Sequence, residues 1–117
     1  MLQYNSVVPL RPPIQDPVIV EFLRQIAPVR DRIPRLVLFG SRARGDCKPN
    51  SDYDILVVLP EKDRRLVDAL YDATMQVLFH THRLISLKIY READFNRYAA
   101  LPTPFLQNVV REGIALG

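Results

Sequence analysis

The sequence has little that could form a disulfide, a structural zinc site or a membrane span. Its single cysteine, Cys47, cannot form an internal disulfide, and no Cys/His cluster at zinc-ligand spacing surrounds it. No apolar run approaches the roughly 20 residues that a transmembrane helix needs. The first residues lack the basic and apolar regions of a signal peptide. We therefore expect a cytoplasmic protein in which Cys47 is an incidental loop thiol.

Strong local charge is also missing. The formal net charge of +3 favours anionic partners such as phosphates, but the Lys and Arg residues are scattered. The Tyr and Phe residues do not alternate with them as a stacking surface for nucleic acid would require. With 117 residues, 48% hydrophobic and 25% charged, the chain has the composition of one globular domain. Nucleic-acid binding is not expected.

Three prolines interrupt residues 1–15, which we interpret as an extended arm preceding a domain over residues 16–117. The apolar residues of the arm are available to pack on the body or on a partner. Asp16 and Pro17 form a helix start, with an N-cap acceptor followed by proline at the first helical position. Apolar residues then recur at helical spacing, so we predict a first helix that ends near Pro28.

Two short apolar runs, Arg35–Phe39 and Asp54–Leu59, predict buried strands. A third strand is predicted over Leu84–Tyr90, where apolar residues alternate with Ser86, Lys88 and other residues of the opposite face. Helical spacing after Glu61 predicts a helix between the second and third strands. Further helices are predicted over residues 92–99 and 105–112, the last one stopped by Gly113.

The first element with chemical meaning is the turn after the first predicted strand. Gly40 would let the backbone turn tightly and approach a ligand closely. Ser41 would then present a hydroxyl and an amide at a helix N-terminus, where a phosphate is favoured. A lone Gly-Ser pair is more often an ordinary turn, so this signal is weak by itself.

The second element is the pair Asp52 and Asp54 at the start of the second predicted strand. Residues two apart on a strand project from the same face, so the two carboxylates would converge on a hard cation such as Mg²⁺. A lone Asp-x-Asp often belongs to a turn or a cap. Joined to Gly40 and Ser41 at the ends of two credible strands, it predicts a nucleotide–metal site.

These motifs resemble a known family. Phe39-Gly40-Ser41, Ala43-Arg44-Gly45 and Ser51-Asp52-x-Asp54 are similar to the signature of the minimal nucleotidyltransferases of the DNA polymerase β superfamily. The segment from Pro104 to Ile114 resembles the closing helix of these small domains. The resemblance covers about Asp16 to Gly117. It implies an α/β (α+β) fold in which a small mixed sheet carries the site on one face and helices on the other.

The resemblance also implies roles for individual residues. Asp52 and Asp54 would hold the metal ions that bridge a triphosphate, while a substrate hydroxyl attacks in line. A third carboxylate usually completes such a site from the neighbouring strand, yet the third predicted strand contains no acid. Depending on register, its position falls at Leu84 or Ser86. Lys88 on the same face would repel a second cation if it pointed inwards, or would extend to solvent.

For the other polar residues, both a functional and a structural role are considered. Arg44 could contact phosphates or pair with a nearby aspartate. Asp46 and Asp63 could replace the missing acid, but are better explained as charges of a loop and a helix start. His80 and His82 close the second predicted helix, where cations suit the helix dipole, and a structural role is favoured for both.

Together these observations predict a nucleotidyltransferase that moves a nucleoside monophosphate, with AMP expected, from the Mg²⁺ complex of a nucleoside triphosphate to a hydroxyl of a protein or small molecule. Small standalone members of the family often act as antitoxins encoded beside a HEPN-type toxin, so a small helical HEPN-type partner is expected. The alternative is a catalytically weak, nucleotide-binding protein that acts on its partner by direct contact.

Overall fold

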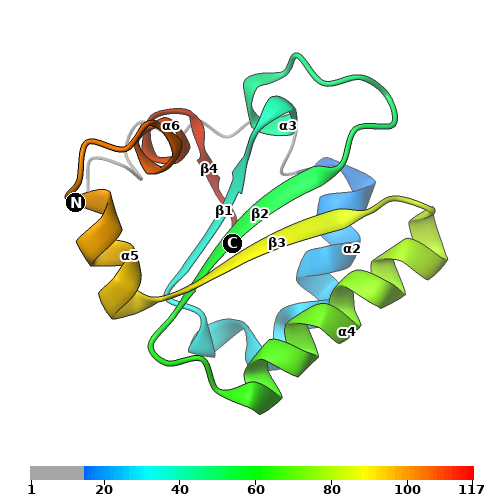
Figure 1. The fold of residues 1–117 in the computed structure, drawn as a ribbon. Helices are drawn as coiled ribbons and strands as arrows, with labels where there is room; N and C mark the ends of the chain where they lie inside the picture. The colour runs from blue at the N-terminus through cyan, green and yellow to red at the C-terminus, as the bar shows by residue number, and fades with distance from the viewer. Residues whose placement is uncertain (1–14) are drawn as a thin grey trace.

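The computed structural model describes residues 15–117, and the arm predicted over residues 1–15 lies outside this range except for Gln15. One mixed four-stranded sheet has the order β3-β2-β1-β4 (Figure 1). The strands are β1 (Arg35–Phe39), β2 (Tyr53–Leu59), β3 (Ile85–Arg91) and β4 (Ile114–Ala115). The helices are α2 (Pro17–Ile26), the 3₁₀ helix η2 (Ala27–Arg32), α3 (Ser41–Arg44), α4 (Arg64–Thr81), α5 (Glu92–Ala99) and α6 (Pro104–Glu112). This is the predicted α+β class.

The strand pairing follows from the connections between the strands. β1 runs antiparallel to β2 and to β4, whereas β2 and β3 are parallel because α4 carries the chain back across the sheet. In this register Phe39 lies opposite Asp54, and Asp54 lies opposite Ser86. The carboxyl end of β1 and the amino ends of β2 and β3 therefore meet at one end of the sheet.

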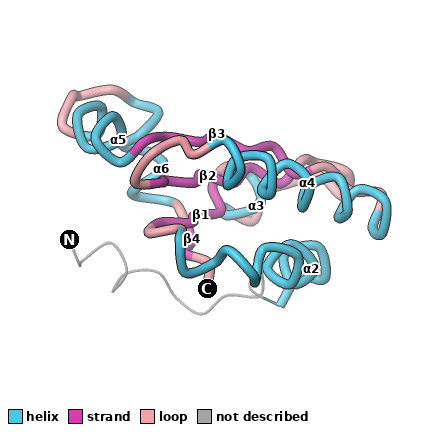
Figure 2. The backbone as a smooth tube through the Cα atoms, turned by 90° about the horizontal axis from the view of Figure 1, so that it is seen from below, coloured by secondary structure: helices cyan, strands magenta, loops and turns pink. Residues whose placement is uncertain are grey.

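The longer helices α2 and α4 cover one face of the sheet (Figure 2). Asp16 caps α2 by accepting a hydrogen bond from the Val18 amide, and Asp63 caps α4 by accepting from the amides of Arg65 and Leu66. The main core lies between these helices and the sheet and includes Ile19, Phe22, Ile26, Leu36, Leu38, Ile55, Val57, Leu59, Leu66, Leu70 and Val77. Each fully buried Leu, Ile or Phe side chain contributes about 1.5–3 kcal/mol.

The distribution of the helices differs from the expectation that they lie on one face. Figure 2 shows α5 and α6 on the opposite side of the sheet from α2 and α4. A second, smaller core there contains Phe95 of α5, Leu106 and Val109 of α6, and the strand residues Val37, Phe39, Leu56 and Val58. The strands β1 and β2 are buried on both faces, which explains why their sequences are apolar runs without alternation.

Most predicted elements are confirmed, with shifts at their ends. The β1 bounds match the prediction, and α4 begins at Arg64 rather than soon after Glu61. The chain does not leave helical geometry at Pro28, because proline fits the first turn of η2. Gly113 ends α6 as expected, but in an extended conformation, since the chain passes directly into the unpredicted strand β4.

Glu21 links the two helices of the main core. Its carboxylate accepts hydrogen bonds from Arg24 and Gln25 within α2, and lies 2.8 Å from Nδ1 of His80 on α4. The Gln25 bond, followed by those of Arg24 and His80, lowers the pKa of Glu21 to about 2. His80 therefore serves a structural contact, as the sequence favoured.

Candidate functional site

The Gly40 turn lies directly against Asp54. Gly40 has a φ of 76°, a left-handed conformation that side chains disfavour. A Cβ at this position would come within 2.5 Å of Asp54 Oδ2. Glycine is therefore needed here for two reasons, its backbone angle and its contact with the carboxylate. The turn and the aspartate pair, ten residues apart in sequence, form one site.

The four-residue helix α3 follows the turn at once. The amides of Ala43 and Arg44 donate to the carbonyl of Gly40, and the amide of Gly45 donates to Ser41. Ala43 is buried in the main core, which fixes the helix on the body of the domain. Ser41, half-buried, is thereby held at the start of α3, directly after Gly40.

Asp54 lies on the face of the sheet that also carries Phe39 and Leu56, and Asp52 precedes β2 near enough for its charge to act on Asp54. Asp52 is exposed and Asp54 is half-buried. Burial, followed by the negative charge of Asp52, raises the pKa of the Asp54 carboxyl above its ordinary value. Lys88 and Arg44 act in the opposite direction. The ionisation of Asp54 is therefore influenced by one neighbouring acid, Asp52, and by two basic side chains, Lys88 and Arg44.

A support behind the aspartates was not recognised in the sequence. Arg42 donates hydrogen bonds to the carbonyls of Pro49 and Ser51, and its guanidinium lies 4.2 Å from the ring centroid of Tyr53. The Tyr53 hydroxyl donates to Asp16 Oδ2 at 2.8 Å. Burial, together with this bond, raises the pKa of Tyr53 to about 12. Arg42 thus holds the loop that leads into the aspartate pair.

We expect Arg42→Ala to lower the free energy of unfolding by about 1–3 kcal/mol, because it removes charged hydrogen bonds and a cation–π contact. Metal-dependent nucleotide affinity should fall as well, since the loop before Asp52 loses its anchor. Chemical denaturation and calorimetry measure the two effects. Arg65→Ala, which removes an exposed arginine from α4, is the matched control, and equal behaviour of the two variants would contradict the role of Arg42.

The register of β3 distinguishes the two positions, Leu84 and Ser86, at which the resemblance would place a third carboxylate. Ser86 lies directly across from Asp54, while Leu84 precedes the strand and is exposed. Lys88 is exposed and two residues further along the same face, and its charge still reaches Asp54. Of the two predicted positions, Ser86 is therefore the one opposite Asp54. Lys88 is exposed to solvent, yet its charge still lowers the pKa of Asp54.

Arg44 is engaged by acids in this structure. Its guanidinium forms ion pairs with Asp46 at 3.2 Å and with Glu112 of α6 at 3.6 Å. These acids raise the pKa of Arg44, with the Asp46 hydrogen bond as the largest cause. The pairing alternative for Arg44 is therefore observed, and Asp46 is accounted for as its partner. Asp63 likewise caps α4 and pairs with Arg32.

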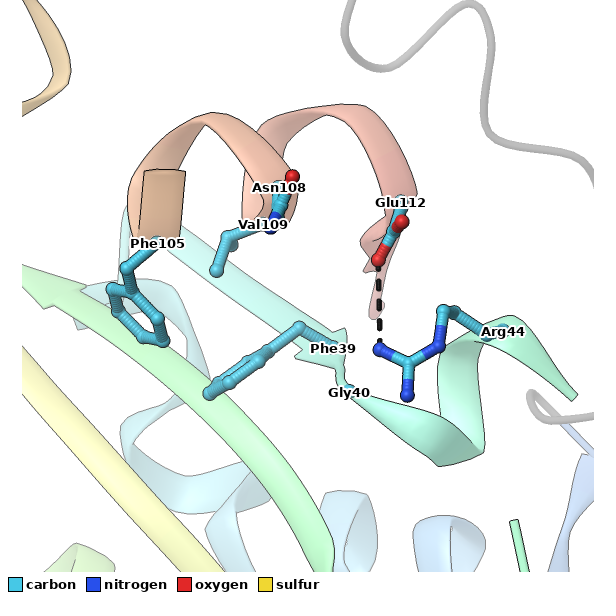
Figure 3. A pocket seen from close by; sticks show the side chains of 7 residues that line it. All are labelled: Phe39, Gly40, Arg44, Phe105, Asn108, Val109 and Glu112. Carbon is cyan, nitrogen blue, oxygen red and sulfur yellow. Dashed lines mark ion pairs between the residues drawn. The ribbon is translucent and has the colours of Figure 1, made fainter. Parts of the chain in front are cut away.

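A pocket of about 230 Å³ opens beside the Gly40 turn, between the end of β1 and α6 (Figure 3). It is lined by Phe39, Gly40, Arg44, Phe105, Asn108, Val109 and Glu112. Figure 3 shows the two phenylalanine rings on one side and the Arg44–Glu112 ion pair on the other. The sequence did not predict this pocket, because it depends on how α6 packs across β1.

The donor set fits a metal ion that arrives with its ligand. Among residues 15–117, no group of three or more Asp, Glu, His or Cys side chains could hold a metal ion. Mg²⁺ is commonly bound by one or two carboxylates, with water and substrate phosphates completing its shell. A cation held by Asp52 and Asp54 would offset both causes of the raised pKa of Asp54, its burial and the negative charge of Asp52, by favouring the ionised carboxylate. The pair is suited to a metal–phosphate complex and not to a preformed cage.

Comparison with known proteins gives a family match over most of the chain. Residues 21–117 match the family model described as "Polymerase beta, Nucleotidyltransferase". Two relatives in Methanocaldococcus jannaschii are named as protein adenylyltransferases. MJ0604 is 33% identical over 103 residues, covering 87% of this chain and 97% of that protein. MJ0141 is 42% identical over 45 residues, covering 38% of this chain and only 46% of its own length.

Solved structures show the same fold. A crystal structure described as a toxin–antitoxin with AMP-PNP has a TM-score of 0.54 and 24% identity, covering 86% of this chain and 70% of that one. A mutant toxin–antitoxin named MntA-HpeT has a TM-score of 0.50 and 21% identity, covering 85% and 69%. At these identities the likeness concerns the fold, and it agrees with the mixed sheet described above.

Proposed function

Since this chain belongs to the polymerase β nucleotidyltransferase family, we propose that it transfers AMP from Mg²⁺-ATP to a hydroxyl group of a protein. The class of enzyme follows from the family. The nucleotide, the metal and the acceptor are the proposal, supported by the site and by the adenylyltransferase names of its relatives.

One observation carries the proposal: Gly40 lies against Asp54, so the turn proposed to bind phosphate and the carboxylates proposed to bind the metal are adjacent. In the proposed complex, a phosphate chain bound at Gly40 would lie within reach of a cation bound by Asp52 and Asp54. Either motif elsewhere in the fold would have an ordinary structural explanation. Their direct contact brings the turn and the carboxylate to one place, which supports a joint role in binding a metal–phosphate ligand.

The transfer forms a bond between the acceptor oxygen and the α-phosphorus, and breaks the bond from that phosphorus to pyrophosphate. The bound metal supplies charge neutralisation for the phosphate oxygens. Gly40 and Ser41 bind the departing end of the triphosphate, and Arg44 can exchange Asp46 or Glu112 for a phosphate oxygen. The hydroxyl proton must leave to water or to a base outside β3, because that strand holds no acid.

We further propose that the acceptor belongs to a small helical partner of the HEPN type. Toxin–antitoxin assemblies among the solved structures of this fold support this choice. Because β3 contains no acidic residue, we also consider a second function, in which the chain binds nucleotide and its partner but transfers AMP poorly.

The test is incubation of the purified chain with its neighbouring gene product and ATP labelled at the α-phosphate. The proposed transferase leaves label on the partner, and label placed at the γ-phosphate is released. Size-exclusion chromatography of the same mixture detects the complex. Complex formation without labelled partner would favour the contact-only candidate, and the absence of both complex and label would contradict the antitoxin-like role.

A further inference from the structure

We propose that the pocket between β1 and α6 receives the nucleobase of the bound nucleotide. This inference rests on the proposed function, because it takes the triphosphate to lie at Gly40 and Ser41. In this inference the pocket contacts the base of the nucleotide, whereas Gly40 and Ser41 contact its phosphates.

The pocket and the phosphate turn are continuous. Gly40 lines the pocket on one side and lies against Asp54 on the other. Phe39, the next residue back along β1, pairs with Asp54 across the sheet and forms the pocket wall. A molecule whose phosphates lie at Gly40 therefore has this pocket as its adjacent cavity on the same face.

The walls suit a flat aromatic ring. Phe39 and Val109 are buried, whereas Phe105 remains 41% exposed beside the opening. The rings of Phe39 and Phe105 meet edge to face, with centroids 5.6 Å apart and planes at 85°. An exposed phenylalanine at the edge of an apolar pocket offers a surface on which a base can stack.

Polar groups stand at the rim where the edges of a base would lie. Asn108 is exposed, and its Oδ1 accepts a hydrogen bond from Arg111. That bond orients the amide and leaves its nitrogen available to donate to a ring nitrogen or a carbonyl. On the opposite side the Arg44–Glu112 ion pair links the pocket to the phosphate turn (Figure 3).

The position of the pocket favours the nucleotide over the acceptor. An in-line acceptor must approach the α-phosphorus from the side opposite to the leaving pyrophosphate. Since the pyrophosphate is taken to lie at Gly40 and Ser41, the acceptor is expected from the side of β3, near Ser86. The pocket lies on the β1 side of Gly40, away from Ser86, which favours the nucleotide as its occupant.

The test compares two ligands, Mg²⁺-ATP and Mg²⁺-tripolyphosphate, which has the phosphates but no base. Calorimetry on the full chain should give about tenfold weaker ATP binding for Phe105→Ala, the scale of losing one aromatic stacking partner. Tripolyphosphate binding should not change. Phe105→Leu, which keeps an apolar side chain without the ring, should also weaken ATP, and Phe79→Ala, an exposed aromatic on α4, should not.

The outcomes separate this inference from the proposed function. If neither ligand binds the parent chain, the phosphate site itself fails. If tripolyphosphate binds as tightly as ATP to the parent, or if Phe105→Ala binds ATP unchanged, the base pocket is wrong while the phosphate site stands. A variant that binds ATP normally but labels its partner poorly would assign the pocket to the acceptor and overturn the inference.

Discussion

Asp52→Asn and Asp54→Asn are each expected to abolish Mg²⁺-dependent nucleotide binding while the domain stays folded. Changes to groups that only orient metal ligands lower metal affinity about 10- to 100-fold, and loss of a direct ligand should exceed that. The fold should survive because Asp52 is exposed and Asp54 has no hydrogen bond or ion pair within residues 15–117. Calorimetry with ATP, with and without Mg²⁺, and thermal melts measure the two effects.

The control for this experiment is Asp46→Asn, which removes an acid of the same loop that pairs with Arg44 rather than facing Asp54. It should leave Mg²⁺-dependent binding within a few-fold of the parent. Parent-like binding by both Asp52→Asn and Asp54→Asn would refute the metal assignment. Unfolding of both variants would instead make the aspartates structural.

Asp54 also predicts a dependence of stability on pH. Its pKa in the folded state is raised, so folding is favoured while the carboxyl is protonated, and this contribution is lost as pH rises through the raised pKa. In metal-free buffer, the parent should therefore lose stability relative to Asp54→Asn as the pH rises from the ordinary pKa of an aspartate to the raised pKa of Asp54. Adding Mg²⁺ and nucleotide should restore the stability of the parent. The pH series of denaturant melts serves as an independent readout of the same carboxylate.

Transfer by the parent chain is expected to be slow, and Ser86→Asp is expected to accelerate it. Binding needs only Asp52, Asp54, the metal and the Gly40 turn, whereas transfer also needs a base near the acceptor. A positioned general base contributes about a hundred- to ten-thousandfold, and an aspartate at 86 should recover part of this factor. The parallel register places position 86 opposite Asp54, on the side from which the acceptor is proposed to approach.

Leu84→Asp is the matched control, because it adds the same acid at an exposed position before β3 begins. It should not accelerate transfer of AMP from α-labelled ATP to the partner. Rapid stoichiometric labelling by the parent chain would refute the expectation of slow transfer. It would direct the search for a base to Asp46, Asp63 or an acid of the partner.

The sequence predicted the parts of the site that depend on local pattern. Gly40 and Asp54 stand at the ends of strands whose apolar runs were clear, and Asp52 lies directly before the second of these strands. The choice between Leu84 and Ser86 needed the pairing of β2 with β3. Register across a parallel connection is fixed by packing and not by a local turn.

Contacts between distant segments could not be predicted from the sequence either, because they also depend on tertiary packing. Tyr53 donates to Asp16 across 37 residues, and the sequence explained Asp16 fully as a helix cap. The packing of α5 on the sheet rests on Phe95 as its single buried residue, too sparse a pattern to predict which face it covers. Phe105 directly follows Pro104 at the start of α6, and its contact with Phe39 depends on the tertiary fold.

The placement of α5 and α6 affects whether water can compete with the acceptor hydroxyl for the activated phosphate. They bury Val58 and Phe39 on their face of the sheet, and leave Asp52, Ser86 and Lys88 half-buried or exposed. An activated phosphate there is open to hydrolysis, since only closure of a site expels solvent. In the proposed reaction the surface that carries the acceptor hydroxyl must also act as the lid. Loss of ATP to AMP and pyrophosphate by the lone chain should therefore fall once the partner binds.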